Sequence, residues 1–467
     1  MPDIAWLPAT EQADLIRRGD LSPVDAVTTY LERIDKFDPT LNSYVTVVGE
    51  QALAQAKRAE RVPEGDRAPF HGVPIAIKDL HETAGIRTTF SSKAYADYVP
   101  TIDAFAVRRL KDAGFIILGK TNASEFGTFP QTESDLNGIA RNPWNPDHTP
   151  GGSSGGAAAA LAAGLCPVAH GSDGGGSIRI PASYCGLFGL KPARGRISSG
   201  PRFGEGWAGM STQGPIARTV RDAAALLDVM AGYATGDPYW APPPERPFVE
   251  EVGADPGKLR IAFTAAAWTG APVDPDVAAA VEDATGLLES LGHTVEEGAP
   301  DWEDPNVTVH FVAVLQAGFA HHVGVDFSLF EPVNKMAVEQ AAEVNSLDYV
   351  RAVTGLHTFT RKVVAFWNDY DILVTPTVPM PPPPVGWISE EEDPWGQLAR
   401  AGLVVPFTAP VNITGQPAVS VPLHWSEAGL PIGVQLIGRP ADEATLIRLS
   451  AQLEDARPWA ERRPPIS

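Results

Sequence analysis

Apolar and polar positions along the 467-residue chain follow two periods, one typical of strands and one typical of helices. Short apolar runs, as buried strands require, lie at 115–118, 259–263, 372–374, 419–421 and 434–437. Between these runs, apolar residues recur at three- and four-residue spacing, which predicts amphipathic helices. Strands interleaved with helices over the whole length predict an α/β fold built around one mixed sheet.

Capping residues mark several of the predicted helix ends. Asp103 is expected to cap a helix that carries Val107 and Leu110 inward and ends at Gly114. Thr219 and Asp222 have capping-box spacing at the start of a second helix. Asp274 and Pro275 fit the N-cap and first position of a third helix, and a last helix is expected from about 442 to 454.

Composition narrows the class of protein. The chain has 57 Asp plus Glu against 36 Lys plus Arg, and its net charge of -21 argues against nucleic acid or an anionic membrane as partner. Cys166 and Cys185 are expected to be buried and unbridged. Because the N-terminal residues lack a signal-peptide pattern and no run of about 18 apolar residues occurs, we expect a cytoplasmic protein.

The most unusual segment runs from Gly151 to Ser177. Nine of its 27 residues are glycine, where average usage predicts about two. Glycine lets the backbone approach other groups closely, and glycine loops can direct several N–H groups at one point. We expect two such loops around a buried helix of small residues, with Ser153 and Ser154 near the helix N-terminus, where partial positive charge favours anions.

The residues of this segment alone leave several interpretations open. Two glycine turns around a helix would need no chemistry at all. A phosphate-binding loop is disfavoured because Ala157 and Ala158 replace the Lys and Ser/Thr of that motif. A nucleophile elbow fits 151–155 and could be completed by Asp371 and His424, but three prolines in 142–150 disfavour the strand that precedes an elbow.

A further interpretation pairs a serine nucleophile with a lysine base. Lys78 ends an apolar run at 73–77 that is expected to be a strand. Taken by itself, a lysine there is typical of a charge that guards the end of a strand.

Three ordered motifs together resemble the amidase signature family. They are G-V-P-x-x-x-K-D at 72–79, G-G-S-S-G-G at 151–156 and G-S-D-G-G-G-S-I-R-x-P at 171–181. The resemblance continues through 412–417 and 429–435 and covers nearly the whole chain. It implies a single α/β/α sandwich domain over 1–467, with a signature core at about 65–235 and a more variable substrate wall at about 200–350.

The resemblance implies a Ser-cis-Ser-Lys triad in which Ser177 attacks, Ser153 bridges and Lys78 is the base. A serine hydroxyl is a weak nucleophile until a base takes its proton, and burial can keep a lysine neutral by lowering its pKa. Backbone N–H groups at Gly174, Gly175, Gly176 and the nucleophile itself would stabilise the oxyanion. Supporting roles are expected for Ser154 as a hydrogen-bonding helix cap and for Asp173 with Arg179 as an ion pair.

The expected reaction cleaves a small linear or cyclic carboxamide to a carboxylate and an amine or ammonia through an acyl-enzyme. Phe126, Phe129 and Trp207 are candidates for the substrate pocket. No cofactor or metal is expected, because His81–Glu82 lacks the second histidine of H-E-x-x-H. A homodimer is compatible with the sequence, which does not determine the oligomeric state.

Two other functions stay open. An amidotransferase A-type subunit, the glutaminase of a tRNA-dependent complex, belongs to the same family, but its usual S-N-L-S-R-x-D-G segment is replaced by different residues at 309–317. A non-catalytic binding subunit would use the glycine loops only to hold an anion. The presence of Lys78, Ser153 and Ser177 together argues against that role.

Overall fold

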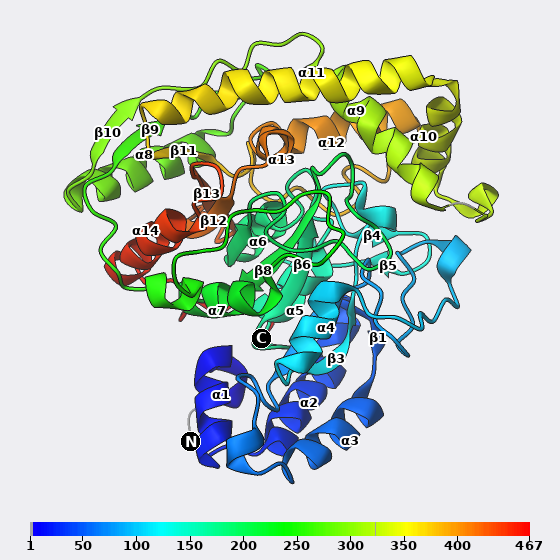
Figure 1. The fold of residues 1–467 in the computed structure, drawn as a ribbon, viewed down its shortest axis with the longest axis vertical. Coiled ribbons are helices and arrows are strands. Elements are labelled where there is room, and N and C mark those ends of the chain that lie inside the picture. Colours follow the sequence, from blue (N-terminus) through cyan, green and yellow to red (C-terminus); the bar gives the residue numbers. More distant parts are fainter. Residues whose placement is uncertain (1–2, 323) are drawn as a thin grey trace.

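The computed structural model describes residues 3–322 and 324–467. Its centre is one mixed sheet of 11 strands in the order β1-β3-β2-β6-β8-β7-β12-β13-β11-β9-β10 (Figure 1). These strands are β1 (Tyr44–Val47), β2 (Pro74–Lys78), β3 (Ile116–Thr121), β6 (Ala169–Asp173), β7 (Phe188–Lys191), β8 (Thr212–Ala217), β9 (Arg260–Phe263), β10 (Thr294–Glu297), β11 (Ile372–Pro376), β12 (Ala418–Trp425) and β13 (Pro431–Ile437). A small separate pair is formed by β4 (Glu133–Ser134) and β5 (Gly138–Ile139).

Helices cover both faces of the large sheet. They are α1 (Ala9–Arg18), α2 (Pro23–Leu41), α3 (Gly49–Ala59), α4 (Phe105–Asp112), α5 (Gly155–Ala162), α6 (Arg179–Cys185), α7 (Val220–Met230), α8 (Pro275–Ser290), α9 (Val307–Ala317), α10 (Pro332–Glu343), α11 (Ser346–Val364), α12 (Pro394–Val404), α13 (Ala409–Thr414) and α14 (Glu443–Ala456). In Figure 1, α11 lies across one end of the molecule and α1 to α3 lie at the other. Within the described residues, no helix combines the length and apolar composition needed to cross a bilayer.

Side-chain alternation along β2 shows how the layers are built. Ile75 and Ile77 belong to a core cluster shared with α1, α4, α7, α8 and α14, whereas Ala76 belongs to a second cluster shared with α2, α3, α5 and α6. Successive residues of a strand point to opposite faces, so these clusters fill opposite sides of the sheet. The predicted α/β sandwich with a large, helix-covered mixed sheet is confirmed.

Local signals predicted several element ends correctly. Thr219 is the N-cap of α7 and accepts a hydrogen bond from the Asp222 N–H at 3.1 Å, and Asp274 caps α8 in the same way. The predicted strands and the last helix are present with small differences in their bounds. Cys166 and Cys185 are both buried and free.

The predicted cap at Asp103 is wrong. Helix α4 begins at Phe105, and its N-cap residue, Ala104, makes no side-chain cap bond. The Asp103 carboxylate instead accepts from the backbone N–H of Ala84 at 2.8 Å and from Lys111 Nζ at 2.7 Å. A tertiary contact and an ion pair therefore replace the local cap.

Two neighbouring parallel strands bring the motif residues together. Lys78 is the last residue of β2 and Asp173 the last of β6, and the two strands pair directly. Their carboxyl ends consequently meet at one edge of the sheet, where α/β proteins commonly bind ligands. Helix α5 packs beside them so closely that a Cβ at Gly156 would lie 2.5 Å from the Asn122 nitrogen.

Candidate active site

Lys78 is completely buried at the end of β2 and contacts two serines. Its Nζ lies 2.8 Å from Ser153 Oγ, 3.1 Å from Ser172 Oγ and 3.3 Å from the Ser172 carbonyl oxygen. A neutral amine has two N–H groups and one lone pair, so it can donate to both Ser172 oxygens while it accepts from the Ser153 hydroxyl. The contacts around Nζ therefore suit the basic form of the side chain.

Burial also favours that form. It lowers the pKa of Lys78 from 10.5 to about 7, and the negative charge of Asp173 opposes this shift only in part. Because desolvation penalises the charged form of a buried lysine, a substantial fraction of the amine is neutral near pH 7. Lys78 can thus accept a proton without a histidine partner.

Ser153 and Ser177 line one cavity of about 160 Å³, together with Ser172 and Gly174. The Gly152–Ser153 peptide bond is cis, and Ser153 lies two residues before the start of α5. The Ser154 N–H donates to the Ser177 carbonyl oxygen at 3.2 Å, which links the two serine-bearing loops. The structure therefore brings Lys78, Ser153 and Ser177 to the same edge of the sheet.

The loop that carries Ser177 is anchored by a buried ion pair. Arg179 donates to both carboxylate oxygens of Asp173, each at 2.9 Å, and neither side chain is exposed. Burial alone would raise the pKa of Asp173, but the Arg179 guanidinium, with help from Lys191 and Asn412, holds it well below its usual value. The carboxylate therefore stays charged and fixes the loop.

One of the predicted oxyanion donors is already engaged. The Gly176 N–H donates to Asp173 Oδ1 at 2.8 Å, because the carboxylate folds the loop back on itself. For the N–H groups of Gly174, Gly175 and Ser177, the described residues offer no hydrogen-bond acceptor. These three amides are the donors that remain for an oxyanion.

Ser154 does not use its side chain as a helix cap. It is the N-cap residue of α5, but it makes no side-chain cap bond. Its Oγ donates instead to the Ser172 carbonyl oxygen at 3.2 Å and accepts from the Ser172 N–H at 3.4 Å. Ser154 therefore supports the strand that holds Ser172.

Two of the three aromatic pocket candidates line the cavity. Phe126 and Trp207 do so, and the Trp207 ring is so close to Gly174 that a Cβ there would lie 2.3 Å from Cζ3. Phe129 does not line it. Phe129 packs in a separate apolar cluster with Val333, Ile388 and Ala401, so its prediction as a pocket residue is wrong.

Most of the remaining cavity wall was not predicted from the sequence. Ser172 stood inside the third motif, and its contact with Lys78 could have been suspected from that position. The other missed residues are apolar, aromatic or imidazole side chains without a local signature: Leu80, His81, Phe90, Phe203, Leu315, Phe319, His321 and His322. Among the described residues that line this cavity there is no Asp, Glu, Lys or Arg, and burial lowers the pKa of His322 to about 4, so that imidazole is neutral.

The histidine-based alternative has no structural support. Asp371 accepts from the Arg260 N–H at 2.7 Å and pairs with Arg439 at 2.9 Å. Neither Asp371 nor His424 is among the described residues that line the cavity of Ser153. The described residues also contain no group of three or more His, Cys, Asp or Glu arranged to hold a metal ion.

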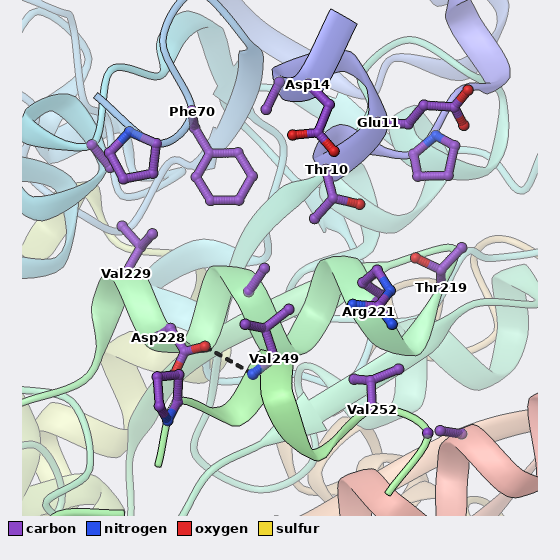
Figure 2. A pocket seen from close by; sticks show the side chains of 18 of the residues that line it. Thr10, Glu11, Asp14, Phe70, Thr219, Arg221, Asp228, Val229, Val249 and Val252 are labelled. Atoms are coloured by element: carbon purple, nitrogen blue, oxygen red, sulfur yellow. Dashed lines mark hydrogen bonds between the residues drawn. The ribbon is translucent and has the colours of Figure 1, made fainter. Parts of the chain in front are cut away.

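A larger cavity, of about 1330 Å³, lies away from these serines. Figure 2 shows it between α1, α7 and the segment after residue 247, where Asp228 accepts a hydrogen bond from the Val249 N–H at 2.9 Å. None of the predicted site residues lines it. Size alone therefore does not locate the chemistry in this molecule.

Comparisons with known proteins agree with this site. A family model described as Amidase matches residues 25–447. The chain is 42% identical to AmiB2 of Mycobacterium tuberculosis, covering 100% of this chain and 99% of that protein, and 36% identical to 6-aminohexanoate-cyclic-dimer hydrolase of Pseudomonas sp., covering 99% and 97%. A solved structure of 6-aminohexanoate cyclic dimer hydrolase complexed with substrate superposes with a TM-score of 0.94 at 36% identity, with 99% of each chain covered.

Proposed function

Because the chain belongs to the amidase signature family, we propose that it hydrolyses a small, uncharged carboxamide, linear or cyclic, through an acyl-enzyme on Ser177. The observation that carries this proposal is the 2.8 Å contact between Lys78 Nζ and Ser153 Oγ beside the cavity that Ser177 also lines. It supplies a base, a bridging hydroxyl and a nucleophile in one place. No cofactor takes part in the proposed reaction.

In the first half of the reaction, Ser177 Oγ attacks the amide carbon while its proton passes to Ser153, whose own proton passes to neutral Lys78. The carbonyl oxygen becomes an oxyanion, to which the N–H groups of Gly174, Gly175 and Ser177 can donate. The C–N bond then breaks as the proton returns from Lys78 through Ser153 to the leaving nitrogen. The products of this half are the ester on Ser177 and the free amine or ammonia.

In the second half, water attacks the ester carbon and gives its proton to the same Ser153–Lys78 relay. A second oxyanion forms and collapses, and Ser177 leaves with a proton returned by Lys78. The carboxylate is released and the triad is restored. Each proton taken from a nucleophile is thus delivered to a leaving group.

The cavity supports a neutral substrate rather than free glutamine. Glutamine carries an ammonium and a carboxylate, and buried charges need partners of opposite charge. The cavity wall among the described residues has no charged side chain to provide them. We therefore favour a stand-alone hydrolase over an amidotransferase A-type glutaminase, although the chain is also 30% identical to the A-type chain of glutamyl-tRNA(Gln) amidotransferase from Thermotoga maritima, with a TM-score of 0.82.

Specificity is assigned to the wall formed by 203–211 and 315–322. Both segments lie within the 200–350 stretch of the proposed single domain, outside the three motifs. Phe203, Trp207 and Phe319 give this wall a strongly apolar, aromatic character. An acyl group with apolar bulk should gain affinity here by burying its surface.

A panel of aliphatic, aryl and lactam amides, assayed beside glutamine for release of amine or ammonia, tests the proposal. At least one neutral amide should be hydrolysed, and the variant Ser177→Ala should lose that activity. Consumption of glutamine with no hydrolysis of any neutral amide would contradict the proposal and favour the amidotransferase role.

A further inference from the structure

Two imidazoles lie beside Lys78, and the proposed reaction gives neither of them a step. His170 is fully buried on β6, and His81 follows β2 and lines the cavity of the serines. Their ring centroids are 4.6 Å apart, with the planes at 86° to each other. The pair therefore joins the two strands whose ends form the site.

The backbone of His81 is held between two lysines. Its N–H donates to the Lys78 carbonyl oxygen at 3.3 Å, and its own carbonyl oxygen accepts from Lys120 Nζ at 2.5 Å. Lys120 is itself fixed by the hydroxyls of Thr83 and Thr88. This anchoring keeps the His81 ring close to Lys78.

Each ring has a nitrogen without a partner. His170 Nε2 lies 2.9 Å from Gln213 Oε1, and the Gln213 amide nitrogen donates to the Ser198 carbonyl oxygen, so Nε2 carries the hydrogen and Nδ1 a free lone pair. His170 Nδ1 and His81 Nε2 are inaccessible and have no hydrogen-bond partner among the described residues. Unpaired buried polar atoms are rare and call for an explanation.

Both rings are uncharged. Burial, assisted by His170, Lys78 and Lys120, holds the pKa of His81 well below its usual value. Burial lowers the pKa of His170 to about 4, although its bond to Gln213 opposes the shift. A neutral ring adds bulk and excludes water, and it presents no negative charge to a neighbouring amine.

The carboxylates near Lys78 are already engaged. Asp173 on β6 is paired with Arg179 of α6 and also has Lys191 of β7 nearby. Asp79, next to Lys78 in the chain, accepts from Thr89 and lies 3.8 Å from Lys120 of β3. The imidazole pair thus meets Lys78 without adding an opposing charge to this set.

We propose that His81 and His170 are positioning residues that form an uncharged, water-excluding wall beside Lys78 and so keep its amine neutral and directed at Ser153. The inference rests on the proposed function, because it gives Lys78 the role of base. What matters in this account is the volume and neutrality of the rings, since the two unpaired nitrogens bind nothing in the described part of the protein.

The test compares His81→Ala with His81→Phe, using the pH dependence of fluorophosphonate labelling of Ser177, read by mass spectrometry. His81→Ala admits water, so its ascending limb should move to higher pH by about one unit or more, with labelling recovered at alkaline pH. His81→Phe keeps a neutral ring and should retain the wild-type limb. His170→Asn, which also removes volume, should shift the limb in the same direction, and His357→Ala on the exposed face of α11 is the matched control.

A His81→Ala variant that loses labelling equally at every pH would overturn the inference, and so would a limb that does not move. Loss of labelling in His81→Phe would also overturn it, because an essential nitrogen would then be at work. Failure of the wild-type protein to label at Ser177 contradicts the proposed function itself. Failure of the inference alone leaves wild-type labelling intact, so the two failures are distinguishable.

Discussion

The Lys78 amine lies 2.8 Å from the Ser153 hydroxyl oxygen, although 75 positions separate the two residues in the chain. Strand β2 ends at Lys78, and the neighbouring parallel strand β6 supplies Ser172, which holds the other side of the amine. The base therefore belongs to the rigid sheet and the bridging hydroxyl to the loop before α5. A site built on such elements is held more precisely than one built on loops alone.

The pH dependence of the reaction should follow Lys78. Because its pKa is lowered to about 7 by burial, and because the neutral amine is the reactive form, kcat/KM should rise through pH 7 and level off above about pH 8. Steady-state kinetics with a neutral amide from pH 5 to 10 provide the measurement. A flat profile from pH 6 to 10, with the chemical step shown to be rate-limiting, would rule out a lysine base.

The same shift should appear in the stability of the protein. The folded pKa of Lys78 lies below the unfolded value of 10.5, so between about pH 7 and 10.5 the unfolded chain binds more protons. The contribution of Lys78 to the free energy of unfolding therefore rises with pH across that window and is least favourable below it. Lys78→Met should be more stable than the wild type at pH 7 in urea unfolding, and this advantage should shrink as the pH approaches 10.5. An advantage that is equal at both pH values would contradict the shift.

Ser172→Ala should lower kcat by about tenfold or more, because the neutral Lys78 amine loses one acceptor that orients its lone pair toward Ser153. KM should change little, since the substrate is not held by this contact. Ser211→Ala is the matched control, because Ser211 lines the same cavity without a contact to Lys78. Equal losses in the two variants would mean that Ser172 has no special role.

Adjacent glycines of the nucleophile loop should respond very differently to alanine. Gly176 has φ of +134°, and a Cβ there would lie 2.4 Å from Thr408 Oγ1, so Gly176→Ala should destabilise the fold or distort the loop. At Gly175 the nearest atom to a Cβ is Phe311 Cζ at 3.7 Å, which is ordinary contact. Thermal unfolding of both variants checks this, and a Gly176→Ala protein as stable as Gly175→Ala would show that the loop adapts.

The sequence predicted the parts of this molecule that depend on local patterns. The cap at Thr219 and the strand that ends at Lys78 follow from neighbouring residues, and the serines were found through three ordered motifs. Asp103 was misjudged because its partners are a distant backbone N–H and a lysine one helix away. Phe129 was misjudged because nothing in the sequence separates an aromatic residue in a pocket from one in a core.

The wall that includes Phe319 and His322 could not have been predicted for a related reason. Its residues come from an irregular segment whose position depends on how α9 packs over the sheet edge, not on a motif. The engagement of the Gly176 N–H by Asp173 is likewise a matter of loop geometry. Motifs therefore located the reacting groups, whereas the substrate wall needed the three-dimensional structure.

The most direct test of the account is to identify the residue that becomes acylated or phosphonylated. The wild-type protein, treated with a fluorophosphonate probe or trapped during turnover of an amide, should carry the adduct on Ser177 by peptide mass spectrometry. The adduct should be absent from Ser177→Ala and should form at least about a thousandfold more slowly in Lys78→Met. An adduct on Ser153, or none on Ser177 in an active wild-type preparation, would contradict the central claim.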